Sequence, residues 1–376
     1  HLSIRRQRQM CIRDRAKEMG FSIYLVGGFV RDLLLGKTHL DLDVVVEGDA
    51  IRLAEELAGI TRARVHSHER FGTAKLIFEE DWNGTPSVDF STARREFYEY
   101  STALPQVERS SIKQDLYRRD FTINTMAISL DEDTFGELLD YYGGERDLRQ
   151  GLIRVLHNLS FIEDPIRMLR AVRLEQRLGF SLEENTEQLI SDALEWLDRV
   201  GGERIRQELE AVFEEERPER SLRRLAELGV LGQISPVLVW EPWIEERLRE
   251  YPGAVERWAH MAEGPERQVQ RPLPNLMMTY LALVGMMVSQ ESVRQLADRL
   301  RLRRDDKEFL LQAHALYRSL PTLSEKDLTR SQIYRRLLLY PEEVIFVCWM
   351  ACEDEVARDR MEPVSYTHLT LPTNRE

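Results

Sequence analysis

Strand-forming patterns are confined to the first part of this chain. Before residue 150, short β-branched runs alternate with helix patterns, whereas amphipathic helix patterns dominate from Leu152 onward. This switch predicts an α+β fold class, with a mixed β-sheet head followed by an all-α remainder. The expected domains are a head over 16–150, a helical neck over 151–200, a helical body over 201–300 and a helical tail over 301–363. A chain of 376 residues has room for about two to four packed units.

The head pattern gives specific element bounds. A helix is expected from the Gly27-Gly28 pair through Leu35, with Gly36 closing it. A second helix is expected over Ala50–Ala58, with Asp49 as its N-cap and Gly59 as its C-cap. Asn83-Gly84 predicts the turn of a hairpin. The expected strands are Ser22–Val26, Asp41–Val46, Arg62–His66, Thr73–Phe78 and Ser87–Ser91.

The remainder of the chain is predicted to be helical. Asp164 followed by Pro165 indicates a capped helix start, and Ser181 with Glu184 indicates a capping box. The apolar run Leu276–Val288 is too short to span a bilayer, so it predicts a buried helix and no membrane contact. Further helices are expected over Glu203–Phe213, Glu219–Leu228, Glu291–Leu300, Lys307–Leu320, Ser331–Leu339 and Glu342–Ala357, the last with Cys348 and Cys352 on one buried face.

The net charge, the cysteine content and the two ends of the chain bear on its possible partners and its cellular location. The net charge of −13 argues weakly against general nucleic-acid binding, so such binding must rest on a local site. Three cysteines form no disulfide framework, and no secretory signal opens the chain, which favours a reduced, cytoplasmic location. The segments Arg5–Arg15 and Val364–Glu376 resemble translated sequencing-adaptor sequence. Residues 1–15 and 364–376 are therefore expected to be artefactual, and whether domains are missing at either end stays open.

Three aspartates in the head are candidate catalytic and metal-binding residues. Asp41 and Asp43 lie two apart on a strand, so both side chains point the same way, and the buried run after them makes plain surface exposure less favourable. Asp89 lies on a separate strand among apolar residues. If the two strands are neighbours, three carboxylates converge, and two Mg²⁺ ions held there would activate a hydroxyl and stabilise leaving pyrophosphate. The alternative for Asp41 and Asp43 is a solvated strand end.

Two further features suit a nucleotide. The turn Gly27-Gly28 leads a strand into a helix, where free N–H groups and Arg31 suit a phosphate, although such a turn is more often only structural. Asp164 and Arg167 lie three apart on the expected helix, so their side chains are neighbours. A carboxylate beside a guanidinium matches the amino donor and ring-nitrogen acceptor of cytosine and adenine, but not uracil or guanine. The alternative is an N-cap with a surface arginine.

Five ordered motifs resemble those of the class II tRNA nucleotidyltransferase and bacterial poly(A) polymerase family. The resemblance covers about Phe21 to Leu231, and one departure is Thr125 where the family usually has alanine. The motifs are GGFVRD from Gly27 with DLD from Asp41 and VDF from Val88, RRDFTIN from Arg118, a hinge of Asp140, Gly143, Gly144, Asp147 and Leu148, EDPIR from Glu163, and ERIRQEL from Glu203.

That resemblance implies template-independent transfer of CMP and AMP from CTP and ATP to an RNA 3′ end, with release of pyrophosphate. Asp41 and Asp43 would bind Mg²⁺, and Asp89 would deprotonate or align the 3′-hydroxyl. The residues implied to bind the nucleotide are Gly27, Gly28 and Arg31 at the triphosphate, Arg119, Asp120 and Asn124 at ribose or phosphate, Asp164 and Arg167 at the base, and Arg170 beside them.

The helical part would hold the tRNA acceptor arm. A basic cluster of Arg299, Arg301, Arg303 and Arg304 is the candidate RNA contact, with a salt-bridged surface as the equal alternative because acids are interleaved with it. His66 and His68 lack the further ligands of a zinc site.

The motifs leave several functions open. Addition of the full CCA sequence is the favoured reading, and A addition, CC addition and poly(A) synthesis remain alternatives. A catalytically inactive RNA-binding protein and a nucleotidyltransferase for small molecules are the alternatives of other classes. The oligomeric state stays open.

Overall fold

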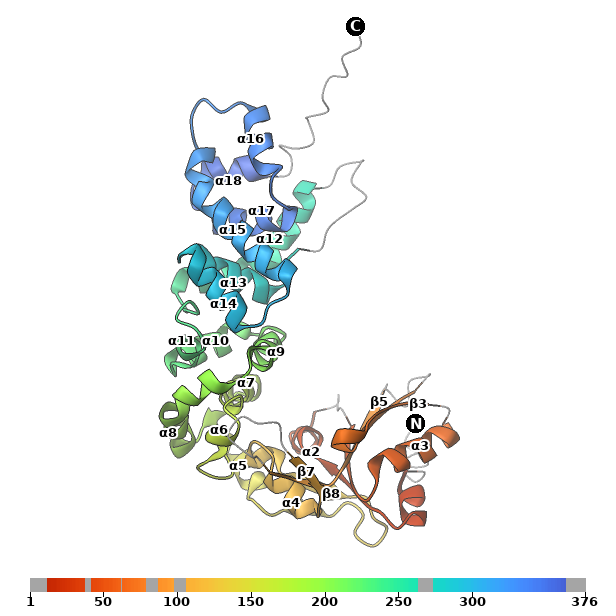
Figure 1. Cartoon of the computed structure of the whole chain (residues 1–376). Coiled ribbons are helices and arrows are strands. Elements are labelled where there is room, and N and C mark those ends of the chain that lie inside the picture. Colours follow the sequence, from red (N-terminus) through yellow and green to blue (C-terminus); the bar gives the residue numbers. More distant parts are fainter. Residues whose placement is uncertain are drawn as a thin grey trace. The chain divides into compact units, whose positions relative to one another are not determined.

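The computed structural model describes residues 12–37, 42–61, 63–78, 87–97, 106–262 and 273–362. The chain divides into two compact units, one ending at Ala193 and the other beginning at Leu194. The first contains a mixed sheet with helices, and the described part of the second is built from helices (Figure 1). The α+β fold class expected from the sequence is therefore confirmed.

A seven-stranded sheet forms the centre of the first unit. Its order is β3-β4-β5-β2-β1-β8-β9, in which β2 and β5 are parallel and every other neighbouring pair is antiparallel. The central strand β2 carries Val44, Val45 and Val46, which are buried, as a strand covered on both faces requires. The strands are β1 (Ser22–Val26), β2 (Leu42–Glu47), β3 (Arg64–His68), β4 (Thr73–Ile77), β5 (Ser87–Thr92), β8 (Met126–Ser129) and β9 (Leu138–Asp140).

Helices and two short strand pairs complete this unit. Helix α3 contacts β2, β3, β4 and β5 through the apolar face that Leu53 and Leu57 share. The small pairs are β6 (Arg94–Phe97) with β7 (Gln106–Arg109), and β10 (Leu152–Ile153) with β11 (Ser181–Leu182). The helices are 12–18, α2 (Gly28–Leu34), α3 (Ala50–Thr61), η1 (Glu69–Phe71), α4 (Ile112–Tyr117), η2 (Thr122–Asn124), α5 (Gly144–Gln150), α6 (Ser160–Glu163), α7 (Arg167–Leu178) and α8 (Glu184–Ala193).

Several local expectations change in this unit. Asp49 does cap α3, since its Oδ1 accepts from the Arg52 amide at 3.1 Å, but Gly59 does not end the helix, which continues to Thr61. The third strand begins at Arg64, and β8 and β9 were not expected. The Asn83-Gly84 turn lies outside the described residues.

Two predicted helix caps are wrong. Helix α7 begins at Arg167 after Ile166 with no side-chain cap, while Asp164 follows the end of α6 and offers its backbone carbonyl to the Arg167 amide at 3.0 Å. Ser181 lies in β11 instead of a capping box. Glu183 takes that role, because its carboxylate accepts from the Thr186 amide at 3.0 Å.

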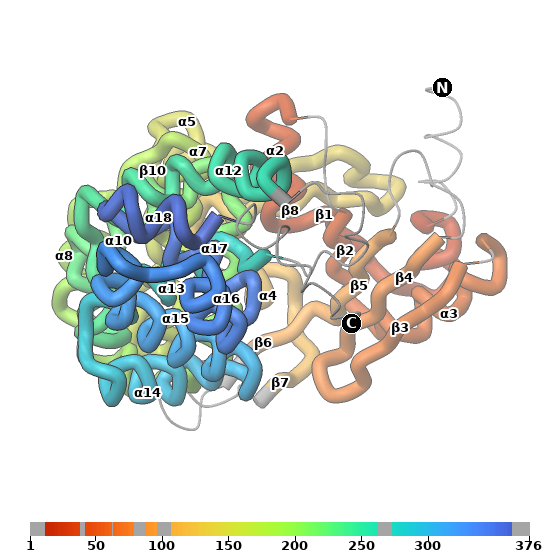
Figure 2. Tube along the Cα trace, turned by 90° about the horizontal axis from the view of Figure 1, so that it is seen from above, coloured from red at the N-terminus to blue at the C-terminus, as the bar shows by residue number. Residues whose placement is uncertain are grey.

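The second unit packs around one buried helix. Every residue of α13 from Met277 to Met286 is buried, and α13 contacts α12, α15 and α17 (Figure 2). The expected buried helix is confirmed. The helices here are η3 (Leu194–Arg199), α9 (Gly202–Phe213), α10 (Pro218–Glu227), α11 (Val230–Ile234), α12 (Pro242–Ala262), α13 (Leu276–Met286), α14 (Gln290–Arg299), α15 (Arg304–Leu323), α16 (Arg330–Leu337), α17 (Glu342–Ala351) and α18 (Glu355–Met361).

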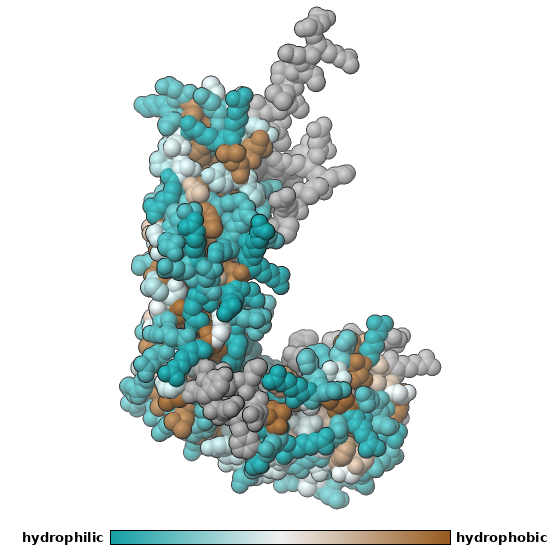
Figure 3. Space-filling view, viewed as in Figure 1, coloured by the Kyte–Doolittle hydropathy of each residue, from teal (hydrophilic) through white to brown (hydrophobic). Residues whose placement is uncertain are grey.

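The end of the second unit differs from the single helix expected there. Cys348 and Cys352 are buried as predicted, but α17 stops at Ala351 and Asp354 caps a separate helix, α18. Within the described ranges, no helix has both the length and the apolar character needed to cross a membrane. The face drawn in Figure 3 is mostly hydrophilic, with small apolar areas scattered over it.

Candidate active site

The paired strands β2 and β5 bring two of the predicted carboxylates together. Asp43 and Asp89 are direct register partners on these parallel strands, so their side chains project from the same face of the sheet. The ammonium of Lys75, on β4, lies 2.9 Å from Asp89 Oδ2. The expectation that the two strands are neighbours is confirmed, whereas Asp41 lies outside the described residues.

The Gly27-Gly28 turn joins β1 to α2 as the sequence predicts. Gly27 has φ of +66°, in the left-handed region that favours glycine. A Cβ added at Gly27 would lie 2.7 Å from Nη1 of Arg119, so the guanidinium of Arg119 packs directly against this turn. Two predicted nucleotide-binding features, the turn and Arg119, therefore meet.

A buried polar network connects α2, η2 and α7. Arg31 is 3% exposed and donates from Nη1 to Asn124 Oδ1 at 2.7 Å. Asn124 Nδ2 donates to Asp120 Oδ1 at 3.0 Å, and Arg170 Nη2 lies 2.8 Å from Asp120 Oδ2. Four predicted nucleotide-binding residues therefore form one connected group.

The carboxylates of this network are held in the charged form. Burial alone would raise the pKa of Asp120, but the charge of Arg170 and the hydrogen bond from Asn124 keep that pKa below its usual value. Burial also opposes ionisation of Asp32, whose pKa is nevertheless lowered by Arg31, which donates to it from Nε and Nη2 at 2.9 Å each. Asp32 was not among the predicted residues.

A cavity of about 280 Å³ opens onto this network. Arg31, Arg170, Arg173 and Arg177 line it with Asp32 and Asp43, so formally four positive charges face two negative ones. Gly28 and Asn124 also line it. A pocket with this charge suits a polyanion such as a nucleotide triphosphate.

The base-reading pair is arranged differently from the expectation. Arg167 is 5% exposed, donates to Ser160 Oγ at 2.7 Å and to the Arg118 carbonyl at 3.0 Å, and so ties α7 to α6 and to the RRDFTIN segment. Asp164 precedes α7, so the two residues do not share one helix. The helical spacing argued from the sequence was therefore wrong, although both residues lie in the same short segment.

The arginine cluster of the second unit does not act as one surface. Arg299 donates to the carbonyls of Val200 and Leu197 at 2.8 Å each, and burial lowers its pKa. The Arg301 carbonyl accepts from Arg206 Nη1 at 3.1 Å. Arg301, Arg303 and Arg304 are exposed. Arg299 is thus part of the internal structure, whereas Arg303 and Arg304 flank the start of α15.

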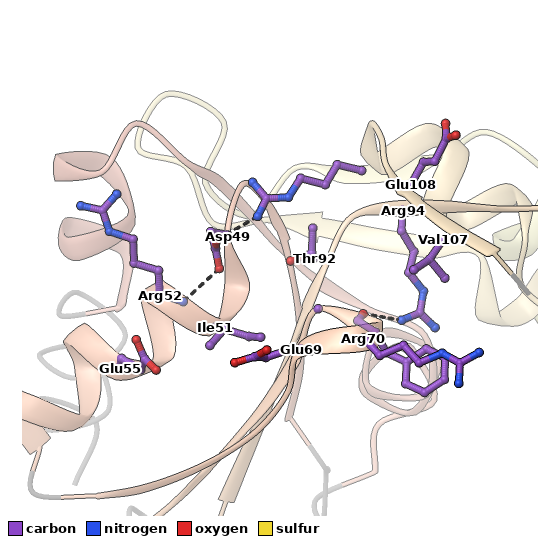
Figure 4. Close-up of a pocket in the computed structure, with 13 residues that line it drawn as sticks. Asp49, Ile51, Arg52, Glu55, Glu69, Arg70, Thr92, Arg94, Val107 and Glu108 are labelled. Atoms are coloured by element: carbon purple, nitrogen blue, oxygen red, sulfur yellow. Dashed lines mark hydrogen bonds and ion pairs between the residues drawn. The ribbon is translucent and has the colours of Figure 1, made fainter.

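A larger cavity, of about 600 Å³, lies elsewhere in the first unit and contains none of the predicted site residues (Figure 4). Asp49 pairs with Arg109 at 2.8 Å on its wall, and Arg94 donates to the Phe71 carbonyl at 2.7 Å. Its four acidic and four basic side chains offset one another. The smaller cavity, with its net positive lining and its aspartates, is the better candidate for nucleotide chemistry.

Known proteins match most of this chain. Residues 23–154 match the poly A polymerase head domain, and residues 179–240 match a probable RNA- and SrmB-binding site of polymerase A. A solved CCA-adding enzyme, apo form II, is 35% identical, with 95% of this chain covering 81% of that one at a TM-score of 0.78. The chain belongs to the class II CCA-adding enzyme family. The resemblance seen in the sequence is confirmed.

Relatives in this family differ in the nucleotides they add. An A-adding tRNA nucleotidyltransferase of Geobacter sulfurreducens is 50% identical over 61% of this chain, and a Thermotoga maritima CCA-adding enzyme complexed with tRNA is 34% identical over 95% of this chain and 80% of its own, with a TM-score of 0.72. The chain spans 26% of the Geobacter protein and 29% of a second A-adding relative, from Aquifex aeolicus. Family membership therefore leaves the specificity open.

The sequence analysis did not identify Asp115, and it named Asp147 only as part of the hinge motif. Asp115 and Asp147 are fully buried, and each binds two arginines. Asp147 also accepts from Thr122 Oγ1 at 2.7 Å and thereby anchors η2. Asp115 precedes RRDFTIN by three residues, and in the sequence it could not be distinguished from a surface acid. The i,i+3 spacing to Arg118 and the i,i+4 spacing to Arg119 were the available clues.

Proposed function

We propose that this protein adds the CCA sequence to the 3′ end of tRNA, transferring CMP and AMP from CTP and ATP and releasing pyrophosphate. The observation that carries the proposal is the cavity where Asp43, Asn124 and Arg170 meet the Gly27-Gly28 turn. Attack by the RNA 3′-hydroxyl on the α-phosphorus forms the new phosphodiester bond and breaks the bond to pyrophosphate, while the hydroxyl proton leaves with a base.

The chain's own residues account for nucleotide binding. Arg31, Arg170, Arg173 and Arg177 offer guanidinium donors to phosphate oxygens, the groups that guanidinium binds best. The guanidinium of Arg119, just before η2, packs against the Gly27-Gly28 turn. Asp120 and Asn124, which are hydrogen-bonded to each other, would bind the ribose of the nucleotide. Relatives solved with ATP and with CTP, 33% and 34% identical to this chain, support these two substrates.

Asp43 suits a hard divalent cation. Mg²⁺ prefers one or two carboxylates together with substrate phosphates, and Asp43 supplies a carboxylate to the phosphate-binding cavity. Its register partner Asp89 is paired with the ammonium of Lys75. Asp41 and Asp43 would hold Mg²⁺, which would lower the pKa of the 3′-hydroxyl and neutralise the leaving pyrophosphate. Asp89 would align the hydroxyl.

Base selection falls to Asp164 and Arg167 in this proposal. The hydrogen bonds of Arg167 to Ser160 and to the Arg118 carbonyl fix its guanidinium and use two of its five N–H donors, so donors remain for a base edge. Cytosine and adenine both present an acceptor next to an amino donor, which matches a guanidinium and a carboxylate. The second unit would hold the tRNA acceptor arm, with Arg301, Arg303 and Arg304 facing solvent.

The decisive experiment incubates the full chain and Mg²⁺ with tRNA transcripts that end before C74, after C75 and after A76. CTP and ATP are supplied singly and together. Addition of CCA to the shortest transcript, stopping at A76, supports the proposal. Long A tails would instead indicate a poly(A) polymerase, and no incorporation of any nucleotide would overturn the catalytic proposal.

A addition alone is the second candidate, and the 50% identity to an A-adding relative favours it. The same assay separates it from CCA addition, because an A-adding enzyme extends only the transcript ending in CC. Small acceptors with a free hydroxyl serve as the control for a nucleotidyltransferase that does not act on RNA.

A further inference from the structure

Asp115 is a buried carboxylate that the proposed reaction does not yet use. It lies in α4, is 0% exposed, and is not among the residues that line the smaller cavity. Arg118 donates to its Oδ1 from Nε at 3.0 Å and from Nη2 at 2.7 Å. Arg119 Nη2 donates to its Oδ2 at 3.1 Å, and the Arg94 amide donates to Oδ1 at 3.3 Å.

The two arginines depend on Asp115 to different degrees. Arg118 donates two hydrogen bonds to one oxygen of Asp115 and has at least one further interaction. Arg119 Nε is buried and has no hydrogen-bond partner among the described residues. Its Nη2 is held by Asp115, and its Nη1 packs against the Gly27 turn. Asp115 therefore fixes the plane of the Arg119 guanidinium beside the turn.

We propose that Asp115 is a positioning residue for nucleotide binding, which orients Arg119 so that its Nη1 faces a phosphate of the incoming nucleotide at the Gly27-Gly28 turn. This inference rests on the proposed function. Asp115 touches neither nucleotide nor metal in this arrangement and acts through Arg119 alone.

Positioning and plain electrostatics predict opposite signs. Asp115 carries a negative charge close to a site for a polyanion, so removing that charge would tighten nucleotide binding if long-range attraction were all that mattered. If Asp115 holds Arg119 in place, removing the Asp115 carboxylate releases the Arg119 guanidinium. Nucleotide binding must then order this side chain again, and the lost rotamer entropy weakens binding. The direction of the change therefore decides between the two.

The test measures the dissociation constant of ATP by titration calorimetry, with the full chain, Mg²⁺ and no tRNA. Asp115→Asn is expected to weaken ATP binding about tenfold, and to raise the KM for ATP more than it lowers kcat in tRNA addition. In an Arg119→Gln background, Asp115→Asn is expected to have no further effect on ATP binding, because it acts through that residue. Arg118→Gln in place of Arg119→Gln should leave the effect of Asp115→Asn intact.

Glu245→Gln is the matched control. Glu245 is also bound by two arginines, Arg223 and Arg249, the latter at 2.7 Å, but it lies in the second unit. The Glu245→Gln substitution is expected to lower the melting temperature without changing the affinity for ATP. If Asp115→Asn does not fold, Asp115→Glu replaces it, since it keeps the charge and displaces the carboxylate by one methylene. Weaker ATP binding by that variant supports the proposal.

The outcomes separate this inference from the proposed function. Unchanged or tighter ATP binding by the folded Asp115 variant overturns the positioning role and leaves tRNA addition untouched. A wild-type chain that binds ATP in an Asp115-dependent way but extends no tRNA overturns the proposed function and not the positioning role. A wild-type chain that binds no ATP overturns both.

Discussion

Arg31 in α2 donates a hydrogen bond of 2.7 Å to Asn124, which lies 93 residues further along the chain. The amide of Asn124 in turn donates to Asp120 at 3.0 Å. One short polar side chain thus sets the distance between the strand-to-helix turn and the segment that carries Asp120. Arg31 and Asn124 both line the cavity, so this connection joins two parts of its wall.

Asn124→Ala is therefore expected to damage both stability and nucleotide binding. It removes the acceptor of a buried guanidinium and a donor to Asp120, at a cost of about 1–3 kcal/mol in the free energy of unfolding. Urea unfolding and ATP titration measure the two effects. Asn275→Ala is the control, because Asn275 caps α13 in the second unit and its loss should lower stability by about 1 kcal/mol without changing the affinity for ATP. Equal ATP binding by both variants would contradict the role given to Asn124.

Gly27→Ala is expected to abolish most nucleotide addition. Gly27 has φ of +66° and ψ of −131°, which is outside the αL region and costs alanine about 1–3 kcal/mol, and the new Cβ would also displace Arg119. Gly36→Ala provides a matched comparison, since Gly36 has φ of +73° and nothing within 4 Å of an added Cβ. Gly27→Ala should lower the melting temperature at least as much as Gly36→Ala does, and only Gly27→Ala should raise the KM for ATP. Similar kinetics in both would show that backbone strain alone explains the loss.

Asp43→Asn and Asp89→Asn are each expected to reduce addition at least about 100-fold at saturating nucleotide, because the first removes a proposed Mg²⁺ ligand and the second removes the carboxylate that would align the 3′-hydroxyl. Both residues are partly exposed, so folding should be nearly unchanged. Single-turnover assays over a Mg²⁺ titration measure the effect. His66→Ala is the control and should retain activity; His66 lies on β3, opposite Lys75 of β4. Wild-type rates in either aspartate variant would remove that residue from the catalytic site.

The acid limb of the stability curve should depend on Asp120. In the unfolded chain its carboxyl titrates near 3.8, whereas Arg170 and Asn124 hold its pKa lower in the folded protein despite burial. The folded state therefore binds fewer protons, so this contribution is complete above about pH 3.8 and disappears as the pH falls through the folded pKa. The free energy of unfolding of Asp120→Asn should vary less steeply than wild type below about pH 4. Parallel curves for the two proteins would contradict this assignment.

The arginines of the second unit should separate into two classes. Arg299→Ala removes two hydrogen bonds to backbone carbonyls and should lower the melting temperature. Arg303→Ala and Arg304→Ala should leave the melting temperature unchanged while weakening tRNA binding, with a shallower dependence on salt. Filter binding across a salt series measures this. Unchanged tRNA affinity in the last two variants would place the RNA contact elsewhere.

Hydrophobic periodicity and short sequence motifs predicted most of the fold. Alternating β-branched runs located β1, β2, β4 and β5, and the apolar run at Leu276 located the buried helix, because both signals depend on residues close in sequence. β9, whose residues are partly exposed, gave no such signal. Gly59 was misread as a C-cap because tertiary contacts of α3 with four strands extend the helix past it.

The candidate site was only partly predictable for a related reason. Motif order identified Asp43, Asp89, Asp120 and Asn124, and their convergence was inferred correctly for the strand pair. The ion-pair partners of the buried carboxylates were not predicted. Asp115 and Asp147 are buried, and their surroundings include residues that only folding brings together. Arg299 looked like an RNA contact in sequence, and its two carbonyl partners lie about a hundred residues earlier in the chain.

The long separation between Arg31 and Asn124 also has a consequence during synthesis. At roughly 5–20 residues per second, a ribosome needs on the order of 5–20 s to make the stretch between them. Throughout that interval β1 lacks its second neighbour, β8, and the nascent chain displays both an unpaired strand edge and a guanidinium without its acceptor. Until β8 emerges, the unpaired edge of β1 can pair with another chain, and a chaperone that covers this edge would prevent such pairing.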